Sequence, residues 1–373
     1  MSTFSATSIQ STSNGATSFP QGLLVGGVSI STLVPMTEFY NQLAAPGTPA
    51  DGAVWWNGTS LFQYFNNNWN TISLVPPPPV FSGERAVFIG GLNNSFVAQS
   101  TMDYVTIATL GNATGFGILT SARGGIASCS NGTRGVVGGG YYSSAIDYIT
   151  IATAGNATSF GTLTVSRAFL GACSDGTKGV FGGGKDSSSA DQNVLDYVTI
   201  ATVSNAIDFG DLTLARIWVS AASNGVRGLF IGGSASNFKN NTIDYITIGT
   251  LGNAVDFGNL LQAVEGTSAC GNDSRIVFAG GARLDNSKWV GIGYLNPNTL
   301  DNAVDFGVLT TGIRGGYMAA AANDTRAIFG GGENGSWSVV NVIDYVTIAT
   351  TGNAVDFGDL ALSRKGLASC SGD

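Results

Sequence analysis

The sequence contains no histidine, and only 11% of its 373 residues are charged. Histidine is the commonest general base and the commonest ligand of transition metals, so its absence removes the most frequent catalytic and metal-binding group. Lys, Glu and Arg are the usual surface residues of helices, and their scarcity disfavours long helices. The composition therefore argues against many classes of enzyme and against a helical fold.

Clusters of basic residues and long apolar runs are missing as well. The chain has 16 Lys and Arg against 24 Asp and Glu, a net charge of -8. A nucleic-acid groove needs clustered cations, so we expect no nucleic-acid partner. No window of about eighteen residues is apolar throughout, so no membrane span is expected. The N-terminus lacks the pattern of a signal peptide, which predicts synthesis and folding in a cytoplasm.

Cysteine is also rare. The four cysteines occupy one place in a repeated motif, and two further copies of the motif carry alanine there: Cys129, Cys173, Cys270 and Cys370, with Ala222 and Ala321. A position that accepts Cys or Ala requires a small buried side chain. We therefore interpret these cysteines as reduced packing residues and favour this over disulfides or a metal site. No metal or cofactor is expected.

Glycine, in contrast, is abundant, with 54 residues, and Phe-Gly pairs recur at intervals of 44 to 51 residues. The pairs are Phe116-Gly117, Phe160-Gly161, Phe209-Gly210, Phe257-Gly258, Phe306-Gly307 and Phe357-Gly358. A period near fifty with four short strand patterns in each unit is typical of a propeller blade. The predicted fold class is all-β, a six-bladed β-propeller.

One unit shows the four expected strands, at 124–130, 134–140, 146–153 and 157–163, with a tight Asn131-Gly132 turn between the first two. The first unit lacks its first strand, whereas the chain ends with an unpartnered first strand at 366–373. We therefore predict that the C-terminal strand completes the first blade and closes the ring. Pro297 predicts a shortened or distorted third strand in the fifth unit.

Three features of each unit resemble the kelch family. A Gly-Gly pair ends the second strand, as in Gly90-Gly91, an aromatic residue follows in the third strand, and an arginine precedes the next first strand. The resemblance covers 85–373 and departs from the family where its usual tryptophan is replaced by the phenylalanine of the Phe-Gly pair. It implies four-stranded antiparallel blades, but it implies no function, because kelch propellers include enzymes, adaptors and structural proteins.

The residues before the propeller are expected to form three parts: an attachment arm at 1–35, a small β-meander at 36–75 and a polyproline linker at 76–82, with the propeller at 83–373. The meander should have strands at 54–56, 61–65 and 69–72. Its text WWNGTSLFQYFNNNW is similar to a module near the N-termini of fibre and virion proteins of tailed bacteriophages. Repeats such as DYVTIATTGNAVDFGDL resemble virion structural propellers of phages of aquatic bacteria.

Two sets of residues are candidates for ligand binding. Arginines precede the first strand of five units, with Val264 in the remaining one: Arg123, Arg167, Arg216, Arg314 and Arg364. We favour pairing of these arginines with neighbouring blades over contact with a ligand. The variable loops between second and third strands carry aromatic residues suited to stacking on sugars or to protein contact. These residues are Phe96, Tyr141, Tyr142, Phe238, Trp289 and Trp337.

Four aspartates precede Phe-Gly pairs, and one interpretation makes them glycosidase acids: Asp208, Asp256, Asp305 and Asp356. Their repetition favours turn residues, because catalytic groups usually break the symmetry of a repeat. The leading interpretation is a non-enzymatic bacteriophage virion protein of a tail fibre, baseplate or capsid appendage. Its expected partners are other virion proteins, a host-surface glycan or protein, and further copies of the chain. The alternatives are an intracellular kelch-type scaffold and, less favoured, a carbohydrate-active enzyme.

Overall fold

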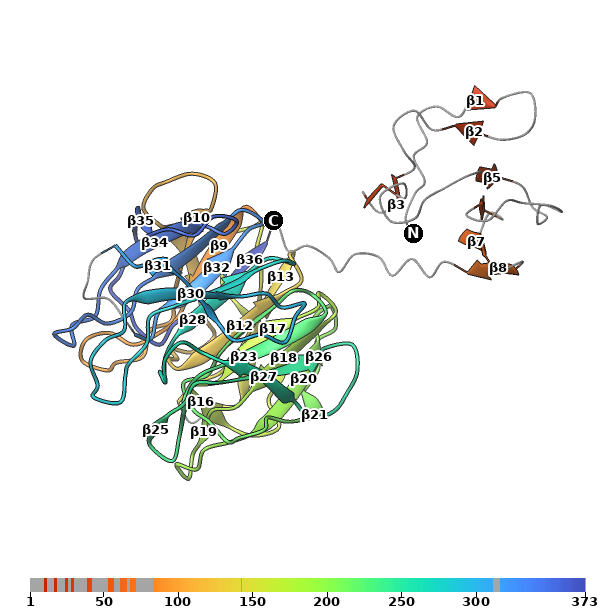
Figure 1. Cartoon of the computed structure of the whole chain (residues 1–373). Helices are drawn as coiled ribbons and strands as arrows, with labels where there is room; N and C mark the ends of the chain where they lie inside the picture. The colour runs from red at the N-terminus through yellow and green to blue at the C-terminus, as the bar shows by residue number, and fades with distance from the viewer. Residues whose placement is uncertain are drawn as a thin grey trace. The chain divides into compact units, whose positions relative to one another are not determined.

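The computed structural model describes residues 83–141, 143–310 and 316–372, together with residue 53 and short strands between residues 10 and 71. The chain divides into two compact units, 1–77 and 78–373. The described residues form strands and no helix, and accordingly none of them belongs to a helix able to cross a membrane. The fold is all-β, as predicted (Figure 1).

The N-terminal unit contains two short hairpins and a four-stranded sheet. The hairpins pair β1 (Gln10–Ser11) with β2 (Thr17–Ser18) and β3 (Leu24–Val25) with β4 (Val28–Ser29). The sheet has the order β5 (Phe39–Asn41), β6 (Val54–Trp56), β7 (Leu61–Phe65) and β8 (Asn68–Thr71). Strands β6, β7 and β8 form an antiparallel meander, and β5, which was not predicted, pairs parallel with β6. The expected linker at 76–82 and most of 1–35 lie outside the described residues.

The second unit is a six-bladed β-propeller, and each blade is a four-stranded antiparallel sheet whose strands we call A to D from the inside outward. Blade 1 has β36 (Ala368–Gly372), β9 (Arg85–Ile89), β10 (Thr101–Thr106) and β11 (Thr114–Ile118). Blade 2 has β12 (Ile126–Ser130), β13 (Arg134–Gly139), β14 (Ala145–Thr150) and β15 (Thr158–Thr162). Blade 3 has β17 (Gly171–Ser174), β18 (Lys178–Gly182), β20 (Val194–Thr199) and β21 (Ile207–Asp211).

The remaining blades repeat this order. Blade 4 has β22 (Ser220–Ser223), β23 (Arg227–Ile231), β26 (Thr242–Thr247) and β27 (Val255–Asn259). Blade 5 has β28 (Ser268–Gly271), β29 (Ile276–Ala279), β30 (Gly291–Leu295) and β31 (Val304–Val308). Blade 6 has β32 (Ala319–Ala322), β33 (Arg326–Gly330), β34 (Val342–Thr347) and β35 (Val355–Asp359). Strand β30 is one residue shorter than the other five C strands, as Pro297 predicted.

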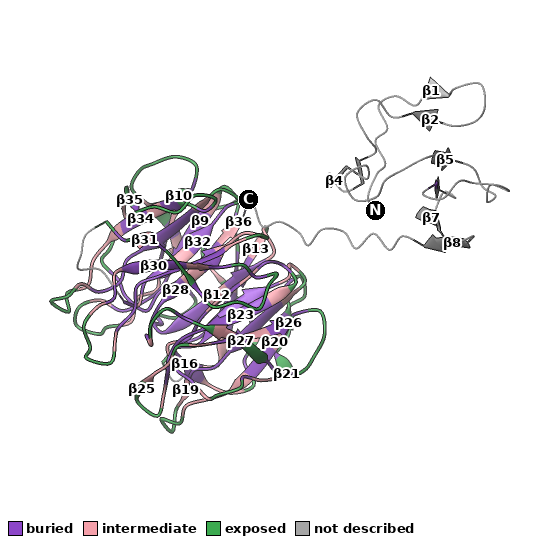
Figure 2. Cartoon of the chain, viewed as in Figure 1, coloured by how far each residue is buried: buried purple, intermediate pink, exposed green. Residues whose placement is uncertain are grey.

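The ring closes as the sequence predicted. The C-terminal strand β36 pairs antiparallel with β9, from Ala368 opposite Ile89 to Gly372 opposite Arg85. Six apolar clusters follow from this closure, one between each pair of adjacent blades. Figure 2 shows the buried residues concentrated in the strands and the exposed residues in the connections between them.

The outer edge of every blade is covered by the next blade. A turn of sequence Gly-Asn-Ala, or a close variant, follows each C strand, and its asparagine side chain accepts a hydrogen bond from strand D of the preceding blade at 2.9–3.2 Å. The alanine after it donates its backbone N–H to the same strand. These contacts satisfy edge groups that would otherwise be free to pair with another chain.

The Phe-Gly pairs make this coverage sterically possible. A Cβ at Gly117 would lie 2.1 Å from the carbonyl oxygen of Gly155 in the covering turn, and Gly117 has a φ of 157°. Only glycine combines this conformation with such a close approach of two backbones. The phenylalanine packs edge-on against the strand C tyrosine of its own blade, as Phe116 does against Tyr104 at 6.1 Å.

The two ends of the propeller differ in what they carry. One end, which we call the turn face, holds the A–B hairpins and the C–D turns. There the basic residue that begins each B strand, or directly precedes it in blade 5, reaches backbone carbonyl oxygens of the next blade, as Arg85 does to Ile151 and Ala152 at 3.0 and 2.6 Å. The other end, the loop face, holds the B–C and D–A connections. Gly83 lies beside Gly372, so the chain enters the propeller at the turn face.

Deleting residues 366–373 should destabilise the whole propeller, because β9 and the blade 6 interface would lose their partner strand. We expect either non-cooperative unfolding or a melting temperature lower by at least about 10 °C, measured by calorimetry. Deletion of residue 373 alone is the control, because β36 ends at Gly372. An unchanged melting temperature in the longer deletion would show that ring closure is dispensable.

Candidate functional site

The loop face is where the candidate residues of the sequence gather, but the structure divides them into two groups. The described arginines are buried beneath the face, with exposures of 0–3%. Each donates to an aspartate on strand C of its own blade at 2.5–2.6 Å: Arg123 to Asp147, Arg167 to Asp196, Arg216 to Asp244 and Arg364 to Asp103. Arg314 lies outside the described residues.

Each described arginine also donates to backbone carbonyl groups of its own blade. Arg216, for example, donates to the carbonyl oxygens of Gly232 and Thr242 at 2.8 and 2.9 Å. Burial lowers the pKa of these guanidinium groups from the usual value, and the adjacent aspartate opposes that shift. The arginines therefore tie strand A to strand C within one blade, and the prediction that they pair with neighbouring blades is wrong. Buried in this way, they cannot serve as the ligand-contacting residues that the sequence also allowed.

The aspartate of blade 1 is less well satisfied than its counterparts. Thr120, Thr164, Thr213 and Thr310 donate their hydroxyl groups across the blade interface to Asp147, Asp196, Asp244 and Asp344. Ala361 occupies the corresponding place before blade 1, and the Oδ1 atom of Asp103 has no hydrogen-bond partner among the residues that the structure describes. Burial raises the pKa of Asp103, although Arg364 and a backbone hydrogen bond from Ala361 oppose the shift.

Blade 5 replaces the whole ion pair by apolar groups. Val264 stands in place of the arginine, Gly293 in place of the aspartate and Leu261 in place of the threonine. Trp289 is 6% exposed and packs with Val264 and Phe278 in the cluster between blades 4 and 5. The prediction that Trp289 lies on an exposed binding loop is therefore wrong, because its ring fills this core.

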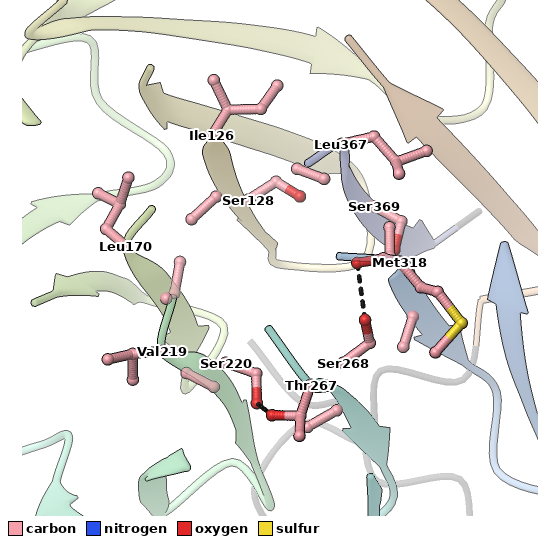
Figure 3. Close-up of a pocket in the computed structure, with 18 residues that line it drawn as sticks. Ile126, Ser128, Leu170, Val219, Ser220, Thr267, Ser268, Met318, Leu367 and Ser369 are labelled. Carbon is pink, nitrogen blue, oxygen red and sulfur yellow. Dashed lines mark hydrogen bonds between the residues drawn. The ribbon is translucent and has the colours of Figure 1, made fainter. Parts of the chain in front are cut away.

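The six A strands surround an axial channel. Two small cavities of about 100 and 120 Å³ lie along it, lined mainly by alanine, serine and cysteine residues of these strands. Figure 3 shows Ser128, Ser220, Ser268 and Ser369 among the side chains around the smaller of the two cavities. The channel is narrow and its lining consists mainly of small side chains, so it does not account for the aromatic and charged residues of the loop face.

The four cysteines are free and buried, as the sequence predicted. Three sulfur atoms lie against glycines of the next blade, so that small residues face the larger thiol: Cys129 against Gly179, Cys173 against Gly228 and Cys370 against Gly135. Burial raises the pKa of Cys370 to about 12, and it raises the pKa of the other three thiols as well. These thiols stay protonated and unreactive near neutral pH.

A closed ring of six backbone hydrogen bonds frames the mouth of the channel on the loop face. One residue from each D–A connection donates its N–H to the preceding blade at 2.7–3.0 Å: Gly125, Phe169, Trp218, Gly266, Tyr317 and Gly366. All six have φ between 54° and 68°. This left-handed conformation suits glycine, and it is uncommon for a bulky residue. Three blades nevertheless place an aromatic residue there.

The three aromatic side chains cover the mouth. The rings of Phe169 and Trp218 stack at 3.8 Å, and Trp218 lies 4.3 Å from the ring of Tyr317. Phe169 is buried, whereas Trp218 and Tyr317 are half-buried. The sequence reasoning missed these residues. Their signal was one aligned position, two or three residues after the arginine, that alternates between glycine and aromatic residues.

The B–C connections form hairpins around the mouth. Phe96 and Trp337 occupy the same hairpin position as Asn286 and Ser189, again with positive φ, and they are 68% and 53% exposed. Phe238, in β25 (Phe238–Lys239), which pairs with β24 (Ser234–Ala235), is 72% exposed. Tyr141 is 43% exposed and contacts Phe169 edge-on. Tyr142 lies outside the described residues.

Charged side chains lie beneath the hairpins of blades 4, 5, 6 and 1. Glu333 is 1% exposed and accepts from Lys288 at 3.0 Å and from Lys365 at 2.7 Å. Glu265 accepts from Lys239 at 2.7 Å and from the hydroxyl group of Tyr317 at 3.2 Å. Burial lowers the pKa of Lys288, and its pairing with Glu333 opposes the shift. In the part of the chain that the structure describes, these ion pairs do not recur from blade to blade, so they are specific to this part of the loop face.

Two of the three ammonium groups of this cluster lie against aromatic rings. The Nζ atom of Lys288 lies 4.0 Å from the ring centre of Trp337 and 5.0 Å from that of Tyr317, and the Nζ atom of Lys365 lies 4.1 Å from that of Phe96. One face of the Phe96 and Trp337 rings therefore lies against a cation, while both side chains stay more than half exposed.

The repeated aspartates do not form a site. Asp208, Asp256, Asp305 and Asp356 are exposed and lie within the D strands β21, β27, β31 and β35, at the outside of four blades, and not in turns as predicted. Among the residues that the structure describes, no three His, Cys, Asp or Glu side chains converge as metal ligands would.

Comparison with known proteins finds no matching protein-family model and no significantly similar curated protein. The fold and the loop face therefore have to be interpreted from their own geometry.

Substituting Ala361→Thr should stabilise the protein, because the new hydroxyl group can donate to the unsatisfied oxygen of Asp103. We expect the free energy of unfolding to rise by about 1 kcal/mol at pH 7, measured by urea denaturation. The raised pKa of Asp103 means that ionisation of this group opposes folding, so the gain should shrink near pH 3, where Asp103 is protonated in both states. The matched control, Thr120→Ala, should lower stability at Asp147. Unchanged stability in Ala361→Thr would contradict this account of blade 1.

Substituting Trp289→Ala should lower the free energy of unfolding by about 3–5 kcal/mol, because it empties the core between blades 4 and 5. Chemical denaturation measures the loss. Phe238→Ala is the control on a neighbouring exposed hairpin and should change stability by less than about 0.5 kcal/mol. Equal losses of unfolding free energy in the two variants would contradict the burial of Trp289 in this core.

Proposed function

We propose that this protein is a non-enzymatic structural component of a tailed bacteriophage particle. The N-terminal unit attaches it to other virion proteins, and the propeller adheres to the host surface through its loop face. Two resemblances support this proposal: the WWNGTSLFQYFNNNW motif at 55–69 and the repeat text with its Gly-Asn-Ala and Phe-Gly elements. The Gly-Gly pairs and the arginines before the A strands support a kelch-like relationship of the propeller.

The observation that carries the adhesion proposal is the distribution of symmetry in the propeller. The turn face and the blade interfaces repeat the same contacts around the ring, for example the asparagine clip in all six blades. The loop face instead carries unrepeated aromatic residues, with Phe96, Phe238 and Trp337 more than half exposed. Geometry that repeats from blade to blade on one face, with variable aromatic hairpins on the other, suits a scaffold that presents a recognition surface.

The position of the chain entry supports the same assignment. Gly83 and the start of β9 lie on the turn face, so the covalent connection toward the N-terminal unit leaves the propeller at the end opposite the loop face. A propeller held from its turn face presents its hairpin aromatics to a partner. Several copies of the chain in one particle would multiply weak contacts with a repetitive cell surface.

Mass spectrometry of purified particles of the phage that encodes this chain tests the location. We expect its peptides in intact particles at a stoichiometry comparable with that of tail or capsid proteins. Absence from purified particles, with the protein present in the infected-cell lysate, would instead favour the intracellular scaffold.

Binding of the full chain to host cells tests the face. The double variant Phe96→Asn and Trp337→Asn carries at both positions the residue that blade 5 has there, Asn286. It should weaken cell binding by at least about tenfold, because it removes both exposed rings. Leu251→Ser, on the exposed C–D turn of the opposite face, is the control and should bind as the unaltered protein does. Equal binding by the double variant would remove the hairpin aromatics from the site.

A further inference from the structure

Five aromatic rings and one ammonium group form a continuous band across the loop face, which we call the axial band. Its members, in spatial order, are Tyr141, Phe169, Trp218, Tyr317, the Lys288 ammonium and Trp337. Successive contacts measure 4.9, 3.8, 4.3, 5.0 and 4.0 Å. The band starts on blade 2, passes over the channel mouth and ends on the hairpin of blade 6, with both end rings exposed.

The backbone of the band is strained in a way that the fold does not require. Phe169, Trp218, Tyr317 and Trp337 have φ values of 63°, 54°, 62° and 62°. A bulky residue in this region costs about 1–2 kcal/mol relative to its normal conformation. Gly125, Gly266 and Gly366 occupy the same ring position in the other blades without that cost. The aromatic side chains are therefore present for a reason other than closing the ring.

The rings are arranged as a platform and not as a deep pocket. Phe169 lies directly over Gly125, and Tyr317 lies directly over Gly266, where an added Cβ would come within 2.7 and 2.5 Å of the rings. Trp218 extends toward Gly366 on the opposite side of the mouth. Only a cavity of about 60 Å³ remains beneath them. A ligand must therefore lie along the band, in contact with the exposed parts of Trp218 and Tyr317, which are half-buried.

The charges beside the band are largely paired, with three ammonium groups against two carboxylates. Lys288 and Lys365 share Glu333, and Lys239 pairs with Glu265, which also accepts from Tyr317. Because each of these three ammonium groups already has a carboxylate partner, the band offers stacking surfaces and hydrogen-bonding groups without a strong net field. This chemistry favours an uncharged ligand rich in hydroxyl groups over a polyanion.

We propose that the axial band binds a linear neutral glycan, whose successive pyranose rings stack along Tyr141, Trp218, Tyr317 and Trp337. Pyranose rings present apolar C–H faces to aromatic rings and hydroxyl groups to flanking polar side chains. A band of several rings across the face fits a chain of sugars better than a single residue. The proposal rests on the proposed adhesive function and names its ligand class and site.

Titration of the full chain with defined oligosaccharides tests the proposal. The probes are neutral hexamers of glucose, mannose and xylose in α- and β-linkages, the matching dimers, and an oligogalacturonate as the anionic comparison. We expect at least one neutral hexamer to shift tryptophan fluorescence and to bind at least about tenfold more tightly than its dimer, by calorimetry. The oligogalacturonate should bind no better than the dimer.

Trp218→Gly is the decisive variant, because glycine is the residue of three equivalent blades and relieves the positive φ. It should weaken hexamer binding by at least about tenfold while the melting temperature stays within a few degrees of the parent. Tyr141→Ala, at the exposed end of the band, should weaken the hexamer and leave the dimer nearly unaffected, and it serves if Trp218→Gly folds poorly. Leu251→Ser, on the exposed C–D turn of the opposite face, is the control and should bind the hexamer as the parent does.

Failure of the band and failure of the proposed function can be told apart. No binding of any neutral hexamer, preference for the anionic probe, or unchanged affinity in both Trp218→Gly and Tyr141→Ala would overturn the band. If Trp218→Gly still adheres to host cells as the parent does, adhesion stands and the glycan band falls. If hexamer binding depends on the band but the protein is absent from purified particles, the band stands and the virion assignment falls.

Discussion

The contact between strand D of one blade and the Gly-Asn-Ala turn of the next is the constraint on which the propeller depends. It brings two backbones so close that a Cβ at Gly117 would overlap the carbonyl group of Gly155. Because every blade must make this contact on one side and receive it on the other, the six blades need nearly the same amino-acid sequence. The repetition that looks like redundancy is thus a steric requirement of a closed ring, and it leaves little freedom for function within the strands.

Blade 5 shows that the requirement concerns volume and pairing and not particular residues. A buried arginine without its aspartate would leave an unpaired charge, which is far more destabilising than losing both partners together. Val264, Gly293 and Leu261 therefore depart from the pattern as a set, and Trp289 packs into the same interface. Gly293 could not return to aspartate alone, because a Cβ there would lie 2.3 Å from the ring of Phe278.

Periodicity was sufficient to predict the number of blades, their strand order, the closure by residues 366–373 and the buried cysteines, since each follows from aligning equivalent units. Partners across the fold were harder to predict. The pairing of Arg364 with Asp103 joins residues 261 positions apart, and the burial of Trp289 depends on what its neighbours lack. Strand β5 has three residues and no pattern to detect, because its pairing depends wholly on β6. The alternation of glycine with Phe169, Trp218 and Tyr317 was visible, but its meaning required the positive φ that all six positions share.

The loop face escapes the constraint because its hairpins lie beyond the edges where blades must match. Its departures from symmetry are not scattered: the strained aromatics at the mouth, the paired lysines and glutamates, and the exposed rings of Phe96 and Trp337 all lie on this face. A fold that needed only stability would keep glycine at every left-handed position of the mouth, as three blades do. The other three blades accept a strained backbone conformation and gain an aromatic side chain at the mouth. In a chain that otherwise repeats itself so closely, ring closure does not account for these aromatic residues, and the proposed ligand binding at this face does.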